Sequence, residues 1–220
     1  MGKLIVIDGL DGSGKETQVK LIFEKLKKYN KKVIRLDFPN YGEPYCEPVK
    51  MYLNGAFGEN PKDVNAYAAS TFFAVDRYAS YMSRWKKYYN DDYIILCDRY
   101  ASSNPIYQLS KLDEKDRINY LDWVYDFEYE KLKIPKPDLV IFIDMPPEFS
   151  FQLIEKRARE TDHNVDIHEK NKEFLIQCYK SAIFCADYYK WEKINTIKDN
   201  KIMSREEISD TIFEKIMKGF

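Results

Sequence analysis

The chain has 220 residues, 45% of them hydrophobic and 32% charged, which suits one α/β domain with a sizeable core. Its 35 basic and 36 acidic side chains leave a net charge of −1. This balance excludes the strong positive field of a nucleic-acid-binding protein and the acidic excess of a disordered tail. We expect a single domain over residues 1–220.

The cysteine spacing, the amino-terminal residues and the length of the apolar runs predict the cellular compartment. The four cysteines form no CxxC pair, so we expect structural thiols in a reducing environment rather than disulfides or a metal site. The amino-terminal residues lack the pattern of a secretory signal, and no apolar run has the length of a membrane span. A cytoplasmic protein with no membrane or nucleic-acid partner is expected.

Short apolar runs alternate with helical patterns along the chain. The runs at 4–7, 33–36, 93–97 and 139–143, and more weakly 194–197, predict five strands. They lack polar alternation, which is typical of parallel strands covered on both faces. The clearest helical spacing comprises Tyr67, Thr71, Ala74, Val75, Tyr78, Met82 and Trp85. This alternation predicts a three-layer α/β sandwich with a five-stranded parallel sheet and ligands beyond the carboxyl ends of the strands.

The first apolar run leads into GLDGSGKET at residues 9–17, the GxxxxGK core of a phosphate-binding loop between a strand and a helix. Glycines at positions 9, 12 and 14 let backbone N–H groups surround phosphate oxygens, and Lys15 can reach the β and γ phosphates. A ligand-free glycine turn is the weaker alternative. We expect nucleotide contacts from Gly9, Asp11, Gly12, Ser13, Gly14, Lys15, Glu16 and Thr17.

One residue of this loop departs from the usual pattern. Glu16 follows the lysine where a hydroxyl usually binds Mg²⁺, and the hydroxyl comes one place later, at Thr17. Either Thr17 takes a related role, or Mg²⁺ is held mostly through water and nucleotide oxygens.

The third apolar run ends in DRYASSNPIYQ at residues 98–108. A carboxylate at this position can hold a Mg²⁺-bound water, and the adjacent guanidinium can neutralise phosphate charge. Asp98 and Arg99 are therefore candidate catalytic residues, with Asp98 and Thr17 as candidate metal ligands. A structural Asp–Arg ion pair is the alternative.

The chain resembles the thymidylate kinase family along nearly its whole length. The resemblance lies in GLDGSGKETQ (9–18), FPNYGEP (38–44), FFAVDR (72–77), DRYASSNPIYQ (98–108) and PKPDLVIFID (135–144). Adenylate kinases share the GKxTQ ending of the loop but have no such DRY segment. The resemblance implies the P-loop NTP hydrolase fold of the nucleoside monophosphate kinase type, a homodimer, and Mg²⁺-assisted transfer of the γ-phosphate of ATP to dTMP.

The same resemblance assigns roles to substrate-binding residues. It places Asp11 near the sugar 3′ hydroxyl, Phe73 against the thymine ring, Arg77 at its O4 and Arg99 at the monophosphate. Ser103 and Tyr107 would line the base and sugar pocket, and Phe38 and Gln108 complete the expected set. Phe73 and Arg77 lie four residues apart, on one helix face. The alternative is that Phe73 is core and Arg77 pairs with Asp76 or a surface acid.

Two departures from the family bear on charge. Tyr41 and Ser13 stand where some members have a phosphate-binding arginine and a P-loop arginine. The charged segment at about 156–169, KRARETDHNVDIHE, loosely resembles the family's arginine-bearing lid, so Arg157 and Arg159 are the candidate catalytic replacements. A solvated basic helix end is the alternative.

Four functions other than dTMP kinase are consistent with parts of the pattern to different degrees. A GTPase switch would need an NKxD-type segment, and the chain has none. A catalytically inactive scaffold stays open because of Glu16 and the atypical lid. Within the kinases, the alternatives are a deoxynucleoside kinase and a monophosphate kinase of broader pyrimidine specificity.

Overall fold

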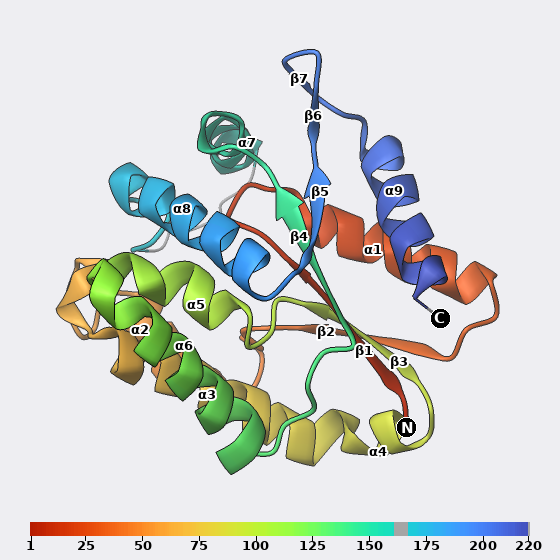
Figure 1. Ribbon diagram of the computed structural model, residues 1–220, viewed down its shortest axis with the longest axis horizontal. Helices are drawn as coiled ribbons and strands as arrows, with labels where there is room; N and C mark the ends of the chain where they lie inside the picture. Colours follow the sequence, from red (N-terminus) through yellow and green to blue (C-terminus); the bar gives the residue numbers. More distant parts are fainter. Residues whose placement is uncertain (161–166, 220) are drawn as a thin grey trace.

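A computed structural model describes residues 1–160 and 167–219 of the chain (Figure 1). Five parallel strands form one sheet in the order β2-β3-β1-β4-β5. The strands are β1 (Lys3–Asp8), β2 (Val33–Asp37), β3 (Ile94–Asp98), β4 (Leu139–Asp144) and β5 (Glu192–Asn195). The prediction of a five-stranded parallel sheet is confirmed.

Helices cover both faces of this sheet (Figure 1). On one face, α1 (Lys15–Lys28) and α9 (Arg205–Lys218) bury aliphatic side chains against Ile5, Ile7 and Ile143. On the other face, α5 (Ser103–Gln108) and α8 (Lys172–Tyr188) pack around Phe142. A strand buried on both faces must be apolar at every position, which explains why the predicted strands are continuous apolar runs.

The remaining elements surround this sandwich. They are η1 (Pro44–Cys46), α2 (Glu47–Leu53), η2 (Pro61–Asp63), α3 (Ala66–Ser80), the π-helical η3 (Tyr81–Trp85), α4 (Lys86–Asn90), η4 (Leu109–Lys111), η5 (Glu114–Asp116), α6 (Arg117–Tyr125), the π-helical η6 (Asp126–Lys131), α7 (Pro147–Glu160), and the hairpin β6 (Ile197–Lys198) and β7 (Lys201–Ile202). Cys46, Cys97, Cys178 and Cys185 are all buried free thiols.

The predicted fifth strand is displaced. Residues 194–197 were expected to form it, but β5 ends at Asn195 and Ile197 starts the hairpin. Thr196 lies between them, fully buried, and its Oγ1 donates to the carbonyl of Asp144 at 2.9 Å. This side-chain bond, together with the Asn195 side chain accepting from the backbone N–H of Ile197, turns the chain out of the sheet.

The helical pattern at 67–85 divides into two faces. Ala74 and Trp85 are fully buried, whereas Tyr67, Val75, Tyr78 and Met82 are each 38–49% exposed. The apolar spacing predicted a helix correctly, but most of that face points away from the core of the chain.

Candidate active site

The phosphate-binding loop joins β1 to α1 at the middle of the sheet. Its turns require positive φ angles, 75° at Gly12 and 82° at Gly14, which glycine adopts without steric cost. A Cβ on Gly12 would lie 2.4 Å from the carbonyl oxygen of Ser150 and 2.8 Å from Ile154, both on α7. The loop therefore contacts α7 directly, and the amino terminus of α1 points into it, an arrangement that binds anions.

Lys15 is folded back into this loop. Its Nζ donates to the Leu10 carbonyl at 2.7 Å, and the side chain is buried. Burial, with Arg99 nearby, lowers the pKa of Lys15 to about 8, although Asp11 and Asp98 oppose the shift. A bound phosphate would add the negative charge that a buried ammonium lacks.

The side chains of Glu16 and Ser13 have different surroundings in this loop. The Glu16 carboxylate pairs with Lys20 at 2.5 Å on the exposed side of α1. The Ser13 hydroxyl is buried and has no hydrogen-bond partner in the described part of the chain. A Cβ on Gly9 would meet this hydroxyl at 2.8 Å, so the Ser13 side chain lies against Gly9 within the loop.

Asp98 ends β3 beside the loop, since it pairs in register with Ile7 of β1. Burial raises the pKa of Asp98, while Lys15 and Arg99 partly offset that effect. Within residues 1–160 and 167–219, neither its carboxylate nor the Thr17 hydroxyl is engaged by another side chain in a hydrogen bond or ion pair. The Asp98 carboxylate and the Thr17 hydroxyl are therefore both available to a ligand.

Arg99 links the DRY segment to the loop. Its guanidinium donates to the Gly9 carbonyl at 3.0 Å, forms an ion pair with Asp11 and lies 5.2 Å above the Tyr107 ring. The Tyr107 hydroxyl donates to the same carboxylate at 2.8 Å. Burial alone would raise the pKa of Asp11, but Arg99, Lys15 and Tyr107 together bring it down to about 2. Asp11 is thus an anion held by three groups.

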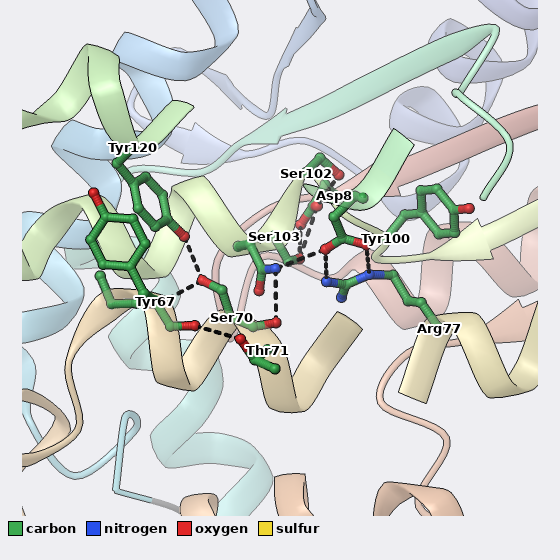
Figure 2. Close-up of polar contacts among 12 residues, drawn as sticks. Asp8, Tyr67, Ser70, Thr71, Arg77, Tyr100, Ser102, Ser103 and Tyr120 are labelled. Atoms are coloured by element: carbon green, nitrogen blue, oxygen red, sulfur yellow. Dashed lines mark hydrogen bonds and ion pairs between the residues drawn. The ribbon is translucent and has the colours of Figure 1, made fainter. Parts of the chain in front are cut away.

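Asp8 was not singled out from the sequence, where it only ends the first strand. Its fully buried carboxylate accepts from the Gly9 backbone N–H at 2.8 Å and from the hydroxyls of Ser102 and Ser103 at 2.6 and 2.9 Å (Figure 2). These bonds fix the start of α5 against the phosphate loop. Ser103, predicted to touch the substrate, is also part of this support.

A pocket opens next to this cluster, with about 510 Å³ of empty space when the open solvent at its mouth is included. All eight residues predicted to bind the substrate line it: Asp11, Phe38, Phe73, Arg77, Arg99, Ser103, Tyr107 and Gln108. Six further lining residues were not predicted as substrate contacts: Pro39, Tyr41, Leu53, Tyr100, Asn104 and His168. Asn104 lies within the segment DRYASSNPIYQ at residues 98–108, so that segment was the sequence signal that could have identified it as a pocket residue.

Arg77 is held from below the pocket by an acid that is remote in sequence. It forms an ion pair with Glu128 of η6, and its Nε donates to Glu128 Oε2 at 3.0 Å. Neither Asp76 nor a surface acid is the partner, because Glu128 is fully buried. Although burial alone would lower the pKa of Arg77, the Glu128 carboxylate raises it. Figure 2 shows the guanidinium of Arg77 in this network.

His168 closes one side of the pocket. Its ring stacks on Tyr107 with centroids 5.3 Å apart, and its Nε2 lies 2.9 Å from the Tyr52 hydroxyl. Lys111 donates to the same hydroxyl at 2.9 Å. The segment at 156–169 was expected to be a surface excursion, yet Ile167 and His168 at its end are buried.

The buried His168 makes stability depend on pH. Burial lowers the pKa of His168 from 6.5 to about 3. As the pH falls, this side chain is therefore protonated in the unfolded chain at a higher pH than in the folded chain. Stability is therefore lost as the pH falls below 6.5, at about 1.4 kcal/mol per pH unit. Relative to His168→Phe, which keeps a ring but cannot titrate, we expect the parent to lose on the order of 2 kcal/mol between pH 7.5 and 5.0. Urea unfolding of both proteins across this range measures the difference; parallel curves would contradict it.

The predicted lid lies partly outside the described residues. The described residues do not include 161–166 or the side chain of Arg157. Arg159, in the last turn of α7, is exposed and lies 3.9 Å from Glu155. Among the contacts of the described residues, none joins Arg159 to the phosphate loop.

Comparisons with known proteins identify the family to which this chain belongs. A family model described as thymidylate kinase matches residues 7–208. The chain belongs to the thymidylate kinase family. Relatives in this family include the thymidylate kinase of Mycobacterium tuberculosis (strain ATCC 25618 / H37Rv), 31% identical over 172 residues, which cover 77% of this chain and 79% of that protein. The thymidylate kinase of Plasmodium falciparum (isolate 3D7) is 29% identical over 99% of this chain and 90% of its own length.

The fold of the family is also found among solved structures. The thymidylate kinase of Candida albicans superposes with a TM-score of 0.71 at 21% identity, covering 99% of this chain and 92% of that one. Among the described residues, no helix has the length and apolarity needed to cross a membrane.

Proposed function

We propose that this chain transfers the γ-phosphate of ATP to dTMP and so produces dTDP. The observation that carries the proposal is the continuity of one pocket, from Asp11 and Arg99 beside the phosphate loop to Phe73 and Arg77 on α3. A phosphate donor and a nucleotide acceptor can then approach each other at the loop end. Membership of the thymidylate kinase family supports the same reaction.

The donor would bind at the phosphate loop. The backbone N–H groups after Gly12 and the ammonium of Lys15 would hold the β and γ phosphates. The available oxygens of Thr17 and Asp98 fit a Mg²⁺ ion that keeps several waters and takes its other ligands from the nucleotide. The ion would neutralise charge on the phosphate oxygens.

The acceptor would lie along the pocket. Arg99 would exchange part of its contact with Asp11 for the monophosphate, and Asp11 and Tyr107 would face the sugar. Phe73 would stack on the base, while Arg77 Nη1, which makes no hydrogen bond in the described part of the chain, would donate to O4. Gln108 is 1% exposed and both its amide atoms lack partners among the described residues, so it is suited to a polar contact with the nucleotide.

An acceptor panel tests this function. ADP release is measured with ATP and either thymidine, deoxycytidine, dTMP, dUMP or dCMP. The proposal expects dTMP to have the largest kcat/KM. Greater activity on the nucleosides would favour a deoxynucleoside kinase, and equal activity on dTMP and dCMP would favour a monophosphate kinase of broader pyrimidine specificity.

Arg77 is predicted to contribute to base choice. A guanidinium offers only donors, which suit the O4 acceptor of thymine and oppose the N4 amino group of cytosine. Opposed polar groups cost about 1 to 3 kcal/mol, or roughly 5- to 150-fold in kcat/KM. Arg77→Gln should therefore lower kcat/KM for dTMP and reduce the dTMP-to-dCMP ratio. The variant leaves the Glu128 carboxylate buried without its counter-charge, which destabilises the fold. Thermal melting therefore checks that the variant used in the assay is folded. An unchanged ratio would show that Arg77 does not read the base.

We also propose that two copies of the chain associate through α3 and the start of η3. Tyr67, Val75, Tyr78 and Met82 recur at spacings of eight, three and four residues and form one exposed apolar stripe. A second copy covering it would explain why this apolar face points away from the core. Val75→Glu should convert a dimer into a monomer in sedimentation velocity. Ile176→Glu, an equally apolar exposed position on α8, should leave the dimer intact.

A further inference from the structure

Glu128 lies behind the pocket and touches two residues that line it. It is fully buried on η6, and its carboxylate faces Arg77 of α3 and Asn104 of α5. None of the chain segments that resemble the family contains it. Its contacts determine which hydrogen-bonding groups the pocket can offer to a base.

The Asn104 amide has one possible orientation in this arrangement. Its Nδ2 donates to Glu128 Oε1 at 2.9 Å and to the backbone carbonyl of Ser70 at 3.3 Å. The reverse orientation would place Oδ1 against two acceptor oxygens. Both Nδ2 hydrogens are thus used, and Oδ1 is the atom left for a ligand; within residues 1–160 and 167–219 it accepts no hydrogen bond.

The Ser70 carbonyl that orients this amide is itself fixed. Ser70 is fully buried on α3, and its hydroxyl lies 2.6 Å from the hydroxyl of Tyr120 on α6 (Figure 2). A buried network that is satisfied on its inner side is rigid. The polarity of Asn104 is therefore set by α3 and η6 rather than by the ligand.

Arg77 is oriented by the same carboxylate. Its Nε and Nη2 face Glu128, which leaves Nη1 directed away from the acid as a donor. The pocket consequently presents a fixed donor, from Arg77, beside a fixed acceptor, from Asn104. This pair complements a base edge that carries an acceptor next to an N–H donor, as O4 and N3–H do in thymine and uracil, and opposes the N4 amino group and N3 of cytosine.

We propose that Glu128 is the positioning residue that selects 4-oxopyrimidine nucleotides, by fixing Arg77 as a donor and Asn104 as an acceptor. This inference rests on the proposed function, because it concerns the base of the same acceptor. Glu128 does not touch the base. It acts through the two side chains that do.

The test is the isosteric variant Glu128→Gln. A glutamine offers one donor and one acceptor, so one of its partners must turn or retract, and the Asn104 amide becomes free to present Nδ2 to the pocket. We expect KM for dTMP to rise about 10-fold with a smaller change in kcat, and the dTMP-to-dCMP ratio of kcat/KM to fall about 10-fold or more. A purely structural role would lower both activities together and leave the ratio unchanged. Glu130→Gln is the matched control, since Glu130 lies in the same segment but is exposed and paired with Lys136.

The outcomes separate this inference from the proposed function. A parent protein inactive on dTMP would overturn both. A parent active on dTMP with a folded Glu128→Gln variant of unchanged ratio would overturn the inference alone. If that variant does not fold, Arg77→Gln is compared with Arg77→Gln/Glu128→Gln, which leaves no unpaired charge at positions 77 and 128. A lower dTMP-to-dCMP ratio in the double variant supports the role through Asn104, and equal ratios overturn it.

Discussion

Replacement of Lys15 by alanine is expected to lower kcat about 1000-fold, or about 4 kcal/mol of transition-state stabilisation, and to leave the protein folded. In the described part of the chain the Lys15 ammonium donates to the Leu10 carbonyl of its own loop, so its loss removes the charge that would follow the transferring phosphate without disturbing the core. Alanine is a good helix former at this first position of α1. Steady-state kinetics with saturating ATP and dTMP, together with circular dichroism, measure both effects.

Lys20→Ala is the matched control for this change. Lys20 lies on the same helix and pairs with Glu16 at the surface, where such pairs contribute little to stability. We expect its kcat to equal that of the parent. A folded Lys15→Ala protein with a tenth or more of the parent kcat would exclude the phosphate-loop mechanism.

The second large effect is expected at Arg157. Ser150 and Ile154 of α7 lie against Gly12 of the phosphate loop, and position 157 belongs to the same helix. The P-loop has Ser13 where some family members have an arginine. We therefore propose that Arg157 supplies the missing charge, and Arg157→Ala should lower kcat roughly 100-fold, by analogy with arginine fingers.

Arg159 separates this role from a general loss of positive charge. Its exposed side chain lies near Glu155, so Arg159→Ala should mainly raise KM for ATP and leave kcat within about 3-fold. Titration of both variants with ATP at saturating dTMP distinguishes the two roles. If neither substitution changes kcat or KM, the charge comes from another basic residue.

The sequence predicted much of the fold because buried parallel strands and a glycine loop have strong local signals. Runs such as Leu139–Ile143 must be apolar throughout when helices cover both faces of the sheet. The fifth strand was misplaced because a tertiary bond of Thr196, which no local pattern reveals, ends it. The spacing on α3 predicted a helix, but amphipathic spacing does not distinguish a face that packs on the core from one that a partner would cover.

By itself, the sequence indicated the loop chemistry, the positions of Lys15, Asp98 and Arg99, and most of the segments that line the pocket, but not those that contribute Leu53 and His168. Each of these follows from residues that are close together along the chain. Only the tertiary structure brought Glu128 beneath Arg77 and Asn104, residues 51 and 24 positions away, and His168 onto Tyr107. Partners at such distances depend on how η6 and the residues before α8 approach the site, and a buried polar group can be matched by any element that reaches it. The physical reason is that hydrogen-bond satisfaction of buried groups is decided in space, whereas strand, loop and helix signals are decided along the chain.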